Sequence, residues 1–148
     1  MQIEIRAAPF DPLEELGRYQ ERLTALRGQY GATASFVGTL RDYNEGERIQ
    51  GMSLEHYPGM TERYLQRIAD EAKRNWALLE LLIIHRVGRL YPNDPIVLVA
   101  VWSVHRAAAF EACRFIMEEL KSQAPFWKQE SLIDGQRWVE HNTPGYTA

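Results

Sequence analysis

Two lysines close together near the end of the chain are the residues best suited to chemistry. Lys73, Lys121 and Lys128 are the only lysines among 17 basic residues, and the others are arginines. A lysine amine can lose its proton and attack an electrophile, whereas an arginine stays charged. The use of lysine twice within eight residues therefore indicates a site that needs an amine. A composition bias combined with chance is the alternative explanation.

Cations elsewhere in the chain stand at positions suited to holding an anion. Arg41 follows the apolar segment 36–40, His105 and Arg106 open an expected helix, and Arg137 comes soon after the two lysines. A helix N-terminus beside an arginine and a histidine favours negative charge. Guanidinium groups near an amine bind phosphate and lower the pKa of the amine by like-charge repulsion. Each cation taken singly is equally a surface charge, so an anion-handling enzyme and a plain binding module both stay open.

The remaining residue types point away from several common classes of enzyme. The single cysteine, Cys113, lies on the apolar side of an expected helix. That position is typical of an inert buried thiol, and a nucleophile or sulfur carrier is the alternative. The sequence has no phosphate-binding glycine motif, no G-x-S-x-G serine motif and no histidine pair at helical metal-binding spacing. We therefore expect no nucleotide-binding fold, no serine hydrolase, no metal and no cofactor.

Length and composition predict one domain that spans residues 1–148. With 45% hydrophobic and 25% charged residues, the chain matches globular proteins of this size. A formal net charge of −3 and the lack of a strongly basic block disfavour nucleic-acid binding. The longest strongly apolar stretch, 96–102, is too short to cross a bilayer, and the first residues lack the apolar segment of a signal peptide. We expect a cytoplasmic protein that contacts no membrane.

A mixture of strands and helices must position these residues. Apolar periodicity, caps and breakers predict strands at 2–6, 32–37, 51–57, 79–87 and 96–102, and helices that begin near Pro12, Thr61 and His105. Segment 41–50 has the composition of an exposed polar loop, and 91–95 that of a turn. Strands and helices do not strictly alternate, which favours an α+β fold with a mixed, largely antiparallel sheet.

The expected helices have recognisable ends and faces. The first should start after Asp11 and be ended by Gly28 and Gly31, the second should be capped by Thr61, and the third should stop before Pro125. The apolar stripe of the third helix is Phe110, Cys113, Met117 and Leu120, with Lys121 at its edge and Phe115 pointing nearly the other way. A helix with two such faces should pack against two neighbours.

Longer strings of the sequence are more specific. In chain order they are FVGTLR at 36–41, LEHYPGMTE at 54–62, IHRVGRLYPND at 84–94, SVHRAAAFEACRFIMEELK at 103–121, APFWKQE at 124–130 and RWVE at 137–140. In order and spacing, from about Pro9 to Glu140, they closely resemble the large, catalytic subunit of molybdopterin synthase. The resemblance implies an α/β hammerhead arrangement within the α+β class.

The resemblance also implies a reaction, the sulfur transfer of molybdenum cofactor biosynthesis. Such a transferase converts cyclic pyranopterin monophosphate, or precursor Z, to molybdopterin by installing two dithiolene sulfurs. The sulfur arrives as a thiocarboxylate on the C-terminal Gly-Gly of a small ubiquitin-like subunit. The present chain ends in Gly-Tyr-Thr-Ala, so the carrier is expected in trans. The family's large subunits form a homodimer with a small subunit at each far end, which makes a heterotetramer.

Several residues receive roles through the same resemblance. The family's two functional lysines fall on Lys121 and Lys128. Its substrate-binding cations fall on Arg41, His105 and Arg106, with Arg137 as a further candidate, and its residues around the pocket and the partner's tail fall on Phe36, Met117 and Glu130. Relatives often continue RWVE with basic residues, whereas this chain has His141 and Asn142, a departure at the outer edge of the expected pocket.

Two other functions stay open at this point. A non-catalytic scaffold would keep the dimer and the carrier groove without turnover, and the presence of both lysines and Arg41 argues against it. A lysine-dependent enzyme acting on another phosphorylated metabolite would bind no ubiquitin-like carrier, which separates it from the sulfur transferase.

Overall fold

The structure is a computed structural model that describes residues 1–44, 46–132 and 135–139. Its elements, in chain order, are β1 (Gln2–Arg6), α1 (Pro12–Glu21), a 3₁₀ turn (Thr24–Leu26), β2 (Ala32–Thr39), β3 (Tyr43–Asn44), β4 (Glu47–His56), α2 (Met60–Trp76), β5 (Glu80–Arg86), β6 (Gly88–Leu90), β7 (Pro95–Ser103), α3 (Arg106–Ser122), β8 (Phe126–Leu132) and β9 (Gly135–Trp138). This arrangement confirms the α+β class. Among the described helices, none is long and apolar enough to cross a membrane.

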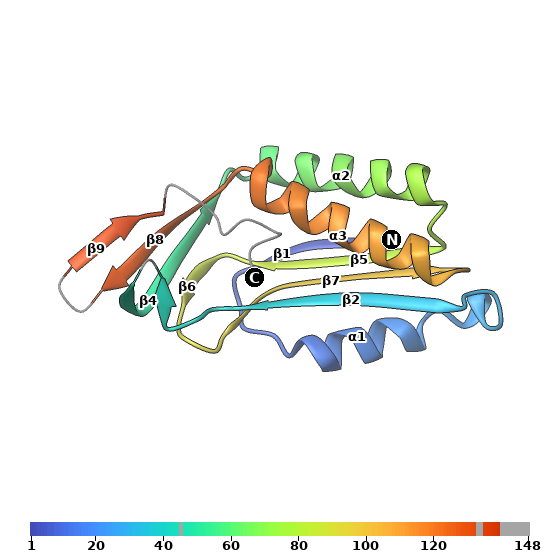
Figure 1. Cartoon of the computed structure of the whole chain (residues 1–148), viewed down its shortest axis with the longest axis horizontal. Helices are drawn as coiled ribbons and strands as arrows, with labels where there is room; N and C mark the ends of the chain where they lie inside the picture. Colours follow the sequence, from blue (N-terminus) through green and yellow to red (C-terminus); the bar gives the residue numbers. More distant parts are fainter. Residues whose placement is uncertain (45, 133–134, 140–148) are drawn as a thin grey trace.

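A four-stranded sheet forms the larger layer of the molecule. Its strand order is β1-β5-β7-β2, with β1 parallel to β5 and the other pairs antiparallel. Helices α2 and α3 cover one face and α1 covers the other (Figure 1). Because both faces are covered, β5 and β7 are buried almost throughout, as their continuous apolar runs predict. The mixed sheet thus sits between two cores.

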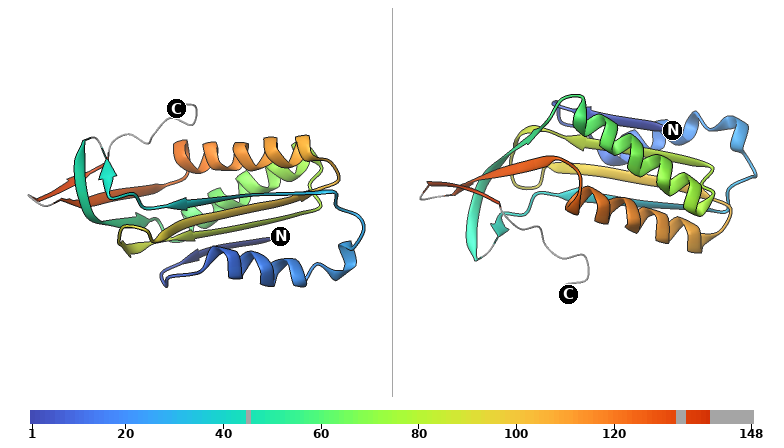
Figure 2. Two further views of the ribbon diagram at one scale, coloured as in Figure 1. Left: turned by 60° about the horizontal axis from the view of Figure 1, so that its bottom comes forward. Right: turned by 90° about the horizontal axis from the view of Figure 1, so that it is seen from above.

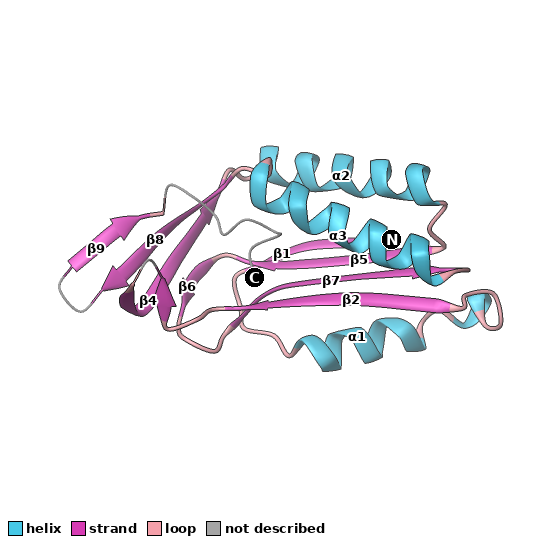
Figure 3. Ribbon diagram, in the orientation of Figure 1, coloured by secondary structure: helices cyan, strands magenta, loops and turns pink. Residues whose placement is uncertain are grey.

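A second, antiparallel sheet lies at one end of the first and is the main departure from the expected single sheet. It contains β3, β4, β8 and β9, with β6 paired to β4 (Figure 3). The two views of Figure 2 show it extending beyond the C-terminal end of α3. Leu40, Met52, Leu54 and Leu90 form its small core, and Phe126 packs against both this core and the helix-covered core. The junction between the sheets is therefore a packed region.

The prediction that 41–50 is an exposed loop is wrong over most of that segment. β3 pairs with the start of β4, with Tyr43 opposite Arg48, and the backbone N–H of Ile49 donates to the carbonyl of Asp42 at 2.7 Å. Ile49 is buried. Its single inward side chain among polar neighbours is too weak a period-2 signal to reveal a strand before its pairing partner is known.

The helix boundaries and faces differ in three places from the expectations. α1 ends at Glu21, earlier than Gly28, and α2 is capped by Gly59 rather than Thr61. The Thr61 hydroxyl accepts from the Tyr57 N–H at 3.0 Å and donates to the Pro125 carbonyl at 3.1 Å. This side chain therefore ties the start of α2 to the segment before β8. Phe110 is 70% exposed, so it is not part of the buried stripe.

Helix α3 packs on two neighbours, as its two faces predict. One face contributes Ala109, Ala112, Ile116 and Leu120 to the core over the sheet. On another side, Phe115 lies against Trp76 of α2, with ring centroids 5.1 Å apart. This double contact fixes the direction of α3, so its last turn points to the junction between the sheets (Figure 1).

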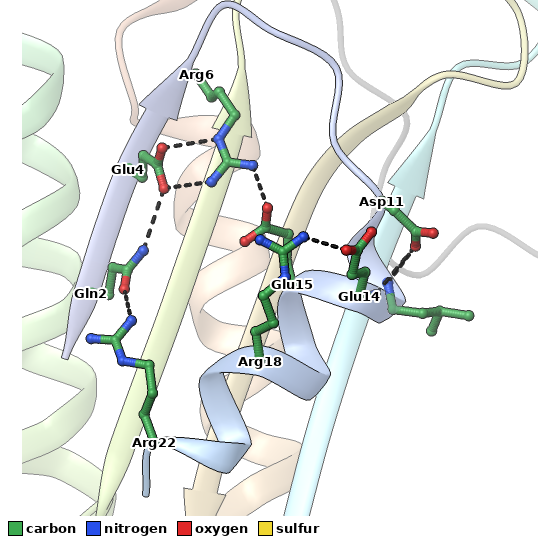
Figure 4. A network of polar contacts seen from close by, with 9 residues as sticks. Gln2, Glu4, Arg6, Asp11, Glu14, Glu15, Arg18 and Arg22 are labelled. Carbon is green, nitrogen blue, oxygen red and sulfur yellow. Dashed lines mark hydrogen bonds and ion pairs between the residues drawn. The ribbon is translucent and has the colours of Figure 1, made fainter.

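Polar contacts attach α1 to the edge of the first sheet (Figure 4). Asp11 accepts hydrogen bonds from the first turn of the helix, as expected of an N-cap. The Arg6 guanidinium lies between Glu4, at 2.8 Å, and Glu15 of α1, at 2.6 Å. Arg22, just after α1, donates to Gln2 at 3.1 Å. The network holds α1 on the face of the sheet opposite α2 and α3.

Candidate active site

A cavity of about 430 Å³ lies where the two sheets and the end of α3 meet. Its wall combines apolar side chains with cations and contains Phe36, Val37, Gly38, Thr39, Arg41, His85, Ile96, Val97, Met117, Glu118, Leu120, Lys121, Ala124, Phe126 and Lys128. Five of the predicted site residues are among them: Phe36, Arg41, Met117, Lys121 and Lys128. An apolar cavity with a few convergent charged groups is the usual form of a small-molecule site.

The two lysines meet in this cavity from different elements. Lys121 stands in the last turn of α3 and Lys128 is the third residue of β8, and their amines lie within hydrogen-bonding reach of each other. Burial, followed by repulsion from Lys121, lowers the pKa of Lys128 to about 7. Desolvation of the amine also lowers the pKa of Lys121, although the residue as a whole is exposed, so the shift is smaller in effect than that of Lys128. Near neutral pH the pair therefore holds an amine that is ready to accept or release a proton.

Charged neighbours adjust this pair in opposite directions. Arg41 repels the Lys121 ammonium and lowers its pKa, whereas Glu118 attracts it. Glu130, only 3% exposed, attracts the Lys128 ammonium from two residues further along β8. Glu130 also accepts from Nε of Arg137 on β9 at 2.9 Å. Glu130 and Arg137 therefore stand behind the cavity wall, and neither lines the cavity itself.

Another part of the cavity wall is apolar and close-fitting. Phe36 on β2 is 41% exposed, which is unusual for a phenylalanine, and it faces the cavity together with Met117 of α3. A Cβ atom at Gly38 would lie 2.8 Å from Cγ1 of Val97 and 3.3 Å from the Phe36 ring. Glycine at this position therefore keeps the wall open where any other residue would crowd it.

His85 is a cavity residue that the sequence analysis missed. It is the next-to-last residue of β5, its ring stacks on Phe126 with centroids 4.0 Å apart and an interplanar angle of 11°, and Nδ1 lies 2.8 Å from the Arg86 carbonyl. Since a carbonyl only accepts, Nδ1 carries the proton. Burial lowers the pKa of His85 to about 4, so its imidazole is uncharged at neutral pH.

His105 and Arg106 do not join the lysines within one chain. They stand at the N-terminal end of α3, where both are exposed, and Lys121 is in its last turn. The 15 residues from Arg106 to Lys121 correspond to about 22 Å along a helix. The expectation that these cations surround one substrate is therefore not met inside a single copy of the chain.

Cys113 lies in the core between α3 and the sheet, outside the cavity wall. Burial raises the pKa of its thiol to about 11, so the thiolate that a nucleophile requires is disfavoured. This agrees with the prediction that Cys113 is an inert buried thiol. His141 and Asn142, expected at the outer edge of the pocket, lie outside the described residues.

Comparison with known proteins matches both the sequence and the fold to one family. Residues 6–123 match the family model described as MoaE protein. The chain is 51% identical over 140 residues to the molybdopterin synthase catalytic subunit of Pseudomonas aeruginosa, covering 95% of this chain and 91% of the relative.

Two solved structures have the same fold. The molybdopterin biosynthesis MoaE protein from Burkholderia ambifaria is 46% identical with a TM-score of 0.78, covering 97% of this chain and 92% of that one. The molybdopterin synthase from Staphylococcus aureus is 33% identical with a TM-score of 0.82, covering 95% and 98%. With a family match over most of its length and a relative at half identity, the chain belongs to the MoaE protein family.

Proposed function

We propose that this protein is the catalytic subunit of a molybdopterin synthase, which transfers sulfur to precursor Z and so forms molybdopterin. The observation that carries the proposal is the pair Lys121 and Lys128, which meet in one cavity from two elements and have lowered pKa values. The names of relatives such as that of Pseudomonas aeruginosa supply the reaction class. The chain's own residues supply the chemistry.

The lysines and Arg41 have different roles because they differ in how readily they lose a proton. A lysine with a pKa near 7 exchanges protons with substrate at neutral pH, which suits Lys128 to general acid–base catalysis. Arg41 is permanently charged and lines the same cavity, so it binds an anionic oxygen of the substrate. A charged Lys121 between them stabilises negative charge that develops as the carboxylate of the carrier leaves.

The sulfur donor in this proposal is a small ubiquitin-like partner with a Gly-Gly thiocarboxylate end. The apolar wall formed by Phe36 and Met117 leads to the lysines. A tail that ends in glycines suits this wall, because its backbone alone must be accommodated there. The buried, inert Cys113 is consistent with a sulfur source outside the chain.

A second copy of the chain gives the distant cations a role. His105 and Arg106 stand about 22 Å of helix away from Lys121 in the same copy. In a homodimer that sets the N-terminal end of one α3 against the cavity of the other copy, this pair completes the substrate site. Each dimer then has two shared sites, and one carrier at each gives a heterotetramer.

Purified chain, thiocarboxylated carrier and precursor Z together test the proposal. We expect molybdopterin to form with the wild type, and Lys121→Ala to lower the rate on the order of a hundredfold or more because a charge contact in the transition state is lost. Lys73→Ala is the matched control, since Lys73 is on α2 outside the cavity. No product with wild-type protein, or equal rates for Lys121→Ala and Lys73→Ala, would refute the proposal.

A further inference from the structure

His85 is the cavity group that the proposed chemistry leaves unused. It reaches the cavity from β5 of the first sheet, whereas the lysines belong to α3 and β8. A buried histidine in an apolar strand is usually a core residue. This ring, however, stacks on Phe126, contacts the Arg86 carbonyl and also lines the cavity. Its contacts show what the ring does to the neighbouring lysine.

The stack with Phe126 links the two sheets at the cavity. His85 ends the pairing of β5 with β7, opposite Val97, and Phe126 is the first residue of β8. Their rings are nearly parallel, at 4.0 Å between centroids. Side chains two apart on a strand share a face, so the ring of Phe126 stands beside Lys128. A contact that fixes Phe126, such as the stack with His85, therefore also fixes how far the Lys128 side chain extends into the cavity.

The hydrogen bond from Nδ1 fixes the plane of this stack. The Arg86 carbonyl accepts at 2.8 Å, which locks both the tautomer and the rotation of the ring. A phenylalanine would keep the stack without this lock, and a glutamine would keep a donor without the ring. The two contacts are thus separable by substitution.

We infer that His85 is a positioning residue for Lys128: its ring, stacked on Phe126 and held by the Arg86 carbonyl, forms part of the cavity wall and keeps water away from the amine. The inference rests on the proposed function, because a lowered pKa of Lys128 matters for catalysis only if this lysine accepts a proton in the reaction. His85 itself contacts neither sulfur nor substrate in this role.

The charged groups around His85 and Lys128 indicate that His85 affects the pKa of Lys128 by excluding water and not through a charge of its own. The groups that act on Lys128 and His85 come from several elements and are Lys121 on α3, Glu130 on β8 and His56 on β4, with Arg41 and Glu118 acting through Lys121. With a pKa of about 4, His85 is neutral where Lys128 titrates. Desolvation is the largest cause of the lowered pKa of Lys128, and the stacked rings are part of what excludes water.

Only three lysines in the chain make a direct test possible. Selective ¹³C and ¹⁵N labelling of lysine gives three amine signals whose pH titrations are read separately by NMR, with Lys73 as an internal reference and Lys121→Arg to identify the signal of Lys121. We expect His85→Gln to raise the pKa of Lys128 by one unit or more, a tenfold change in its protonation ratio. His85→Phe, which keeps a ring against Phe126, should shift it much less.

Phe126→Leu is the second variant, because it removes the stack from the other strand and should raise the pKa of Lys128 as His85→Gln does. An unchanged Lys128 titration in the folded Gln or Leu variant, or equal shifts in His85→Phe and His85→Gln, would overturn the inference. The titration needs neither carrier nor substrate. If the pKa of Lys128 shifts in these variants but the wild-type protein forms no molybdopterin, the proposed function alone is refuted. If the wild type forms molybdopterin but the pKa of Lys128 does not shift in the variants, the positioning role alone is refuted.

Discussion

Lys128→Met should make the protein more stable and inactive at the same time. Burial and the neighbouring Lys121 lower the pKa of Lys128 from 10.5 to about 7. The folded state therefore holds the charged amine less well than the unfolded chain does, and protonation opposes folding. Methionine has a similar length and no charge, so it fills the same space without this penalty.

The size of the effect follows from the pKa difference. One pKa unit corresponds to about 1.4 kcal/mol, so the lowered pKa sets an upper bound of about 5 kcal/mol on the free energy opposing folding. The cavity is partly open to water and Glu130 attracts the ammonium, and both reduce the effect. We expect a gain of about 1–2 kcal/mol in the free energy of unfolding, which is the size common for a single stabilising substitution.

The stability difference between Lys128→Met and the wild type should depend on pH in a defined direction. Below about pH 7 the amine is protonated in both states and the full penalty applies; above the ordinary pKa of 10.5 it is neutral in both and the penalty is gone. The advantage of Lys128→Met should therefore be largest at pH 6 and shrink between pH 7 and 10.5. Urea unfolding of variant and wild type at pH 6, 7.5 and 9 measures it, with Lys73→Met as the control. An advantage that is absent or does not change with pH would refute a desolvated amine at this site.

Three further outcomes are expected. Turnover should rise with pH through about 7 as Lys128 loses its proton, and an acid limb that ends well below pH 6 in the rate profile would contradict its role as proton acceptor. Cys113→Ala should keep nearly full turnover, since the thiol lies outside the cavity; loss of turnover by a stably folded variant would count against an external sulfur source. Co-expressed Lys121→Ala and Arg106→Ala chains, each inactive alone, should regain about one quarter of the activity if sites are shared across a dimer. No recovery in the mixed dimers would contradict a site shared between two copies of the chain.

Residue type singled out the lysine pair, because lysine is scarce in this chain and recurs near the C-terminus, and the family resemblance supplied its expected role. Its partner His85 was not singled out, because the ring acts through contact with Phe126, 41 residues further along the chain. A histidine between Ile84 and Arg86 has no local signal that separates a core residue from a cavity wall. Only the arrangement of β5 against β8 makes the difference.

The same contrast holds for the larger elements. Continuous apolar runs were sufficient to predict β5 and β7, since strands covered on both faces are apolar throughout. The strands of the second sheet have mixed composition and are stabilised by pairing between distant segments, such as Met52 with Glu130. The separation of Arg106 from Lys121, by contrast, follows from helix length and was available from the sequence once both were assigned to one helix.

Sulfur transfer from the carrier is tested most directly in a single turnover with isotopically labelled sulfur. The carrier's thiocarboxylate is made with ³⁴S and mixed with the protein and precursor Z in the presence of unlabelled sulfide, with at least two carriers per precursor Z because each tail delivers one sulfur. The product is analysed by mass spectrometry. We predict molybdopterin labelled at both dithiolene positions with the wild type, and labelled product that forms on the order of a hundredfold or more slowly with Lys121→Ala. Product that carries only unlabelled sulfur, or label transfer that does not depend on Lys121 and Lys128, would contradict sulfur transfer at this cavity.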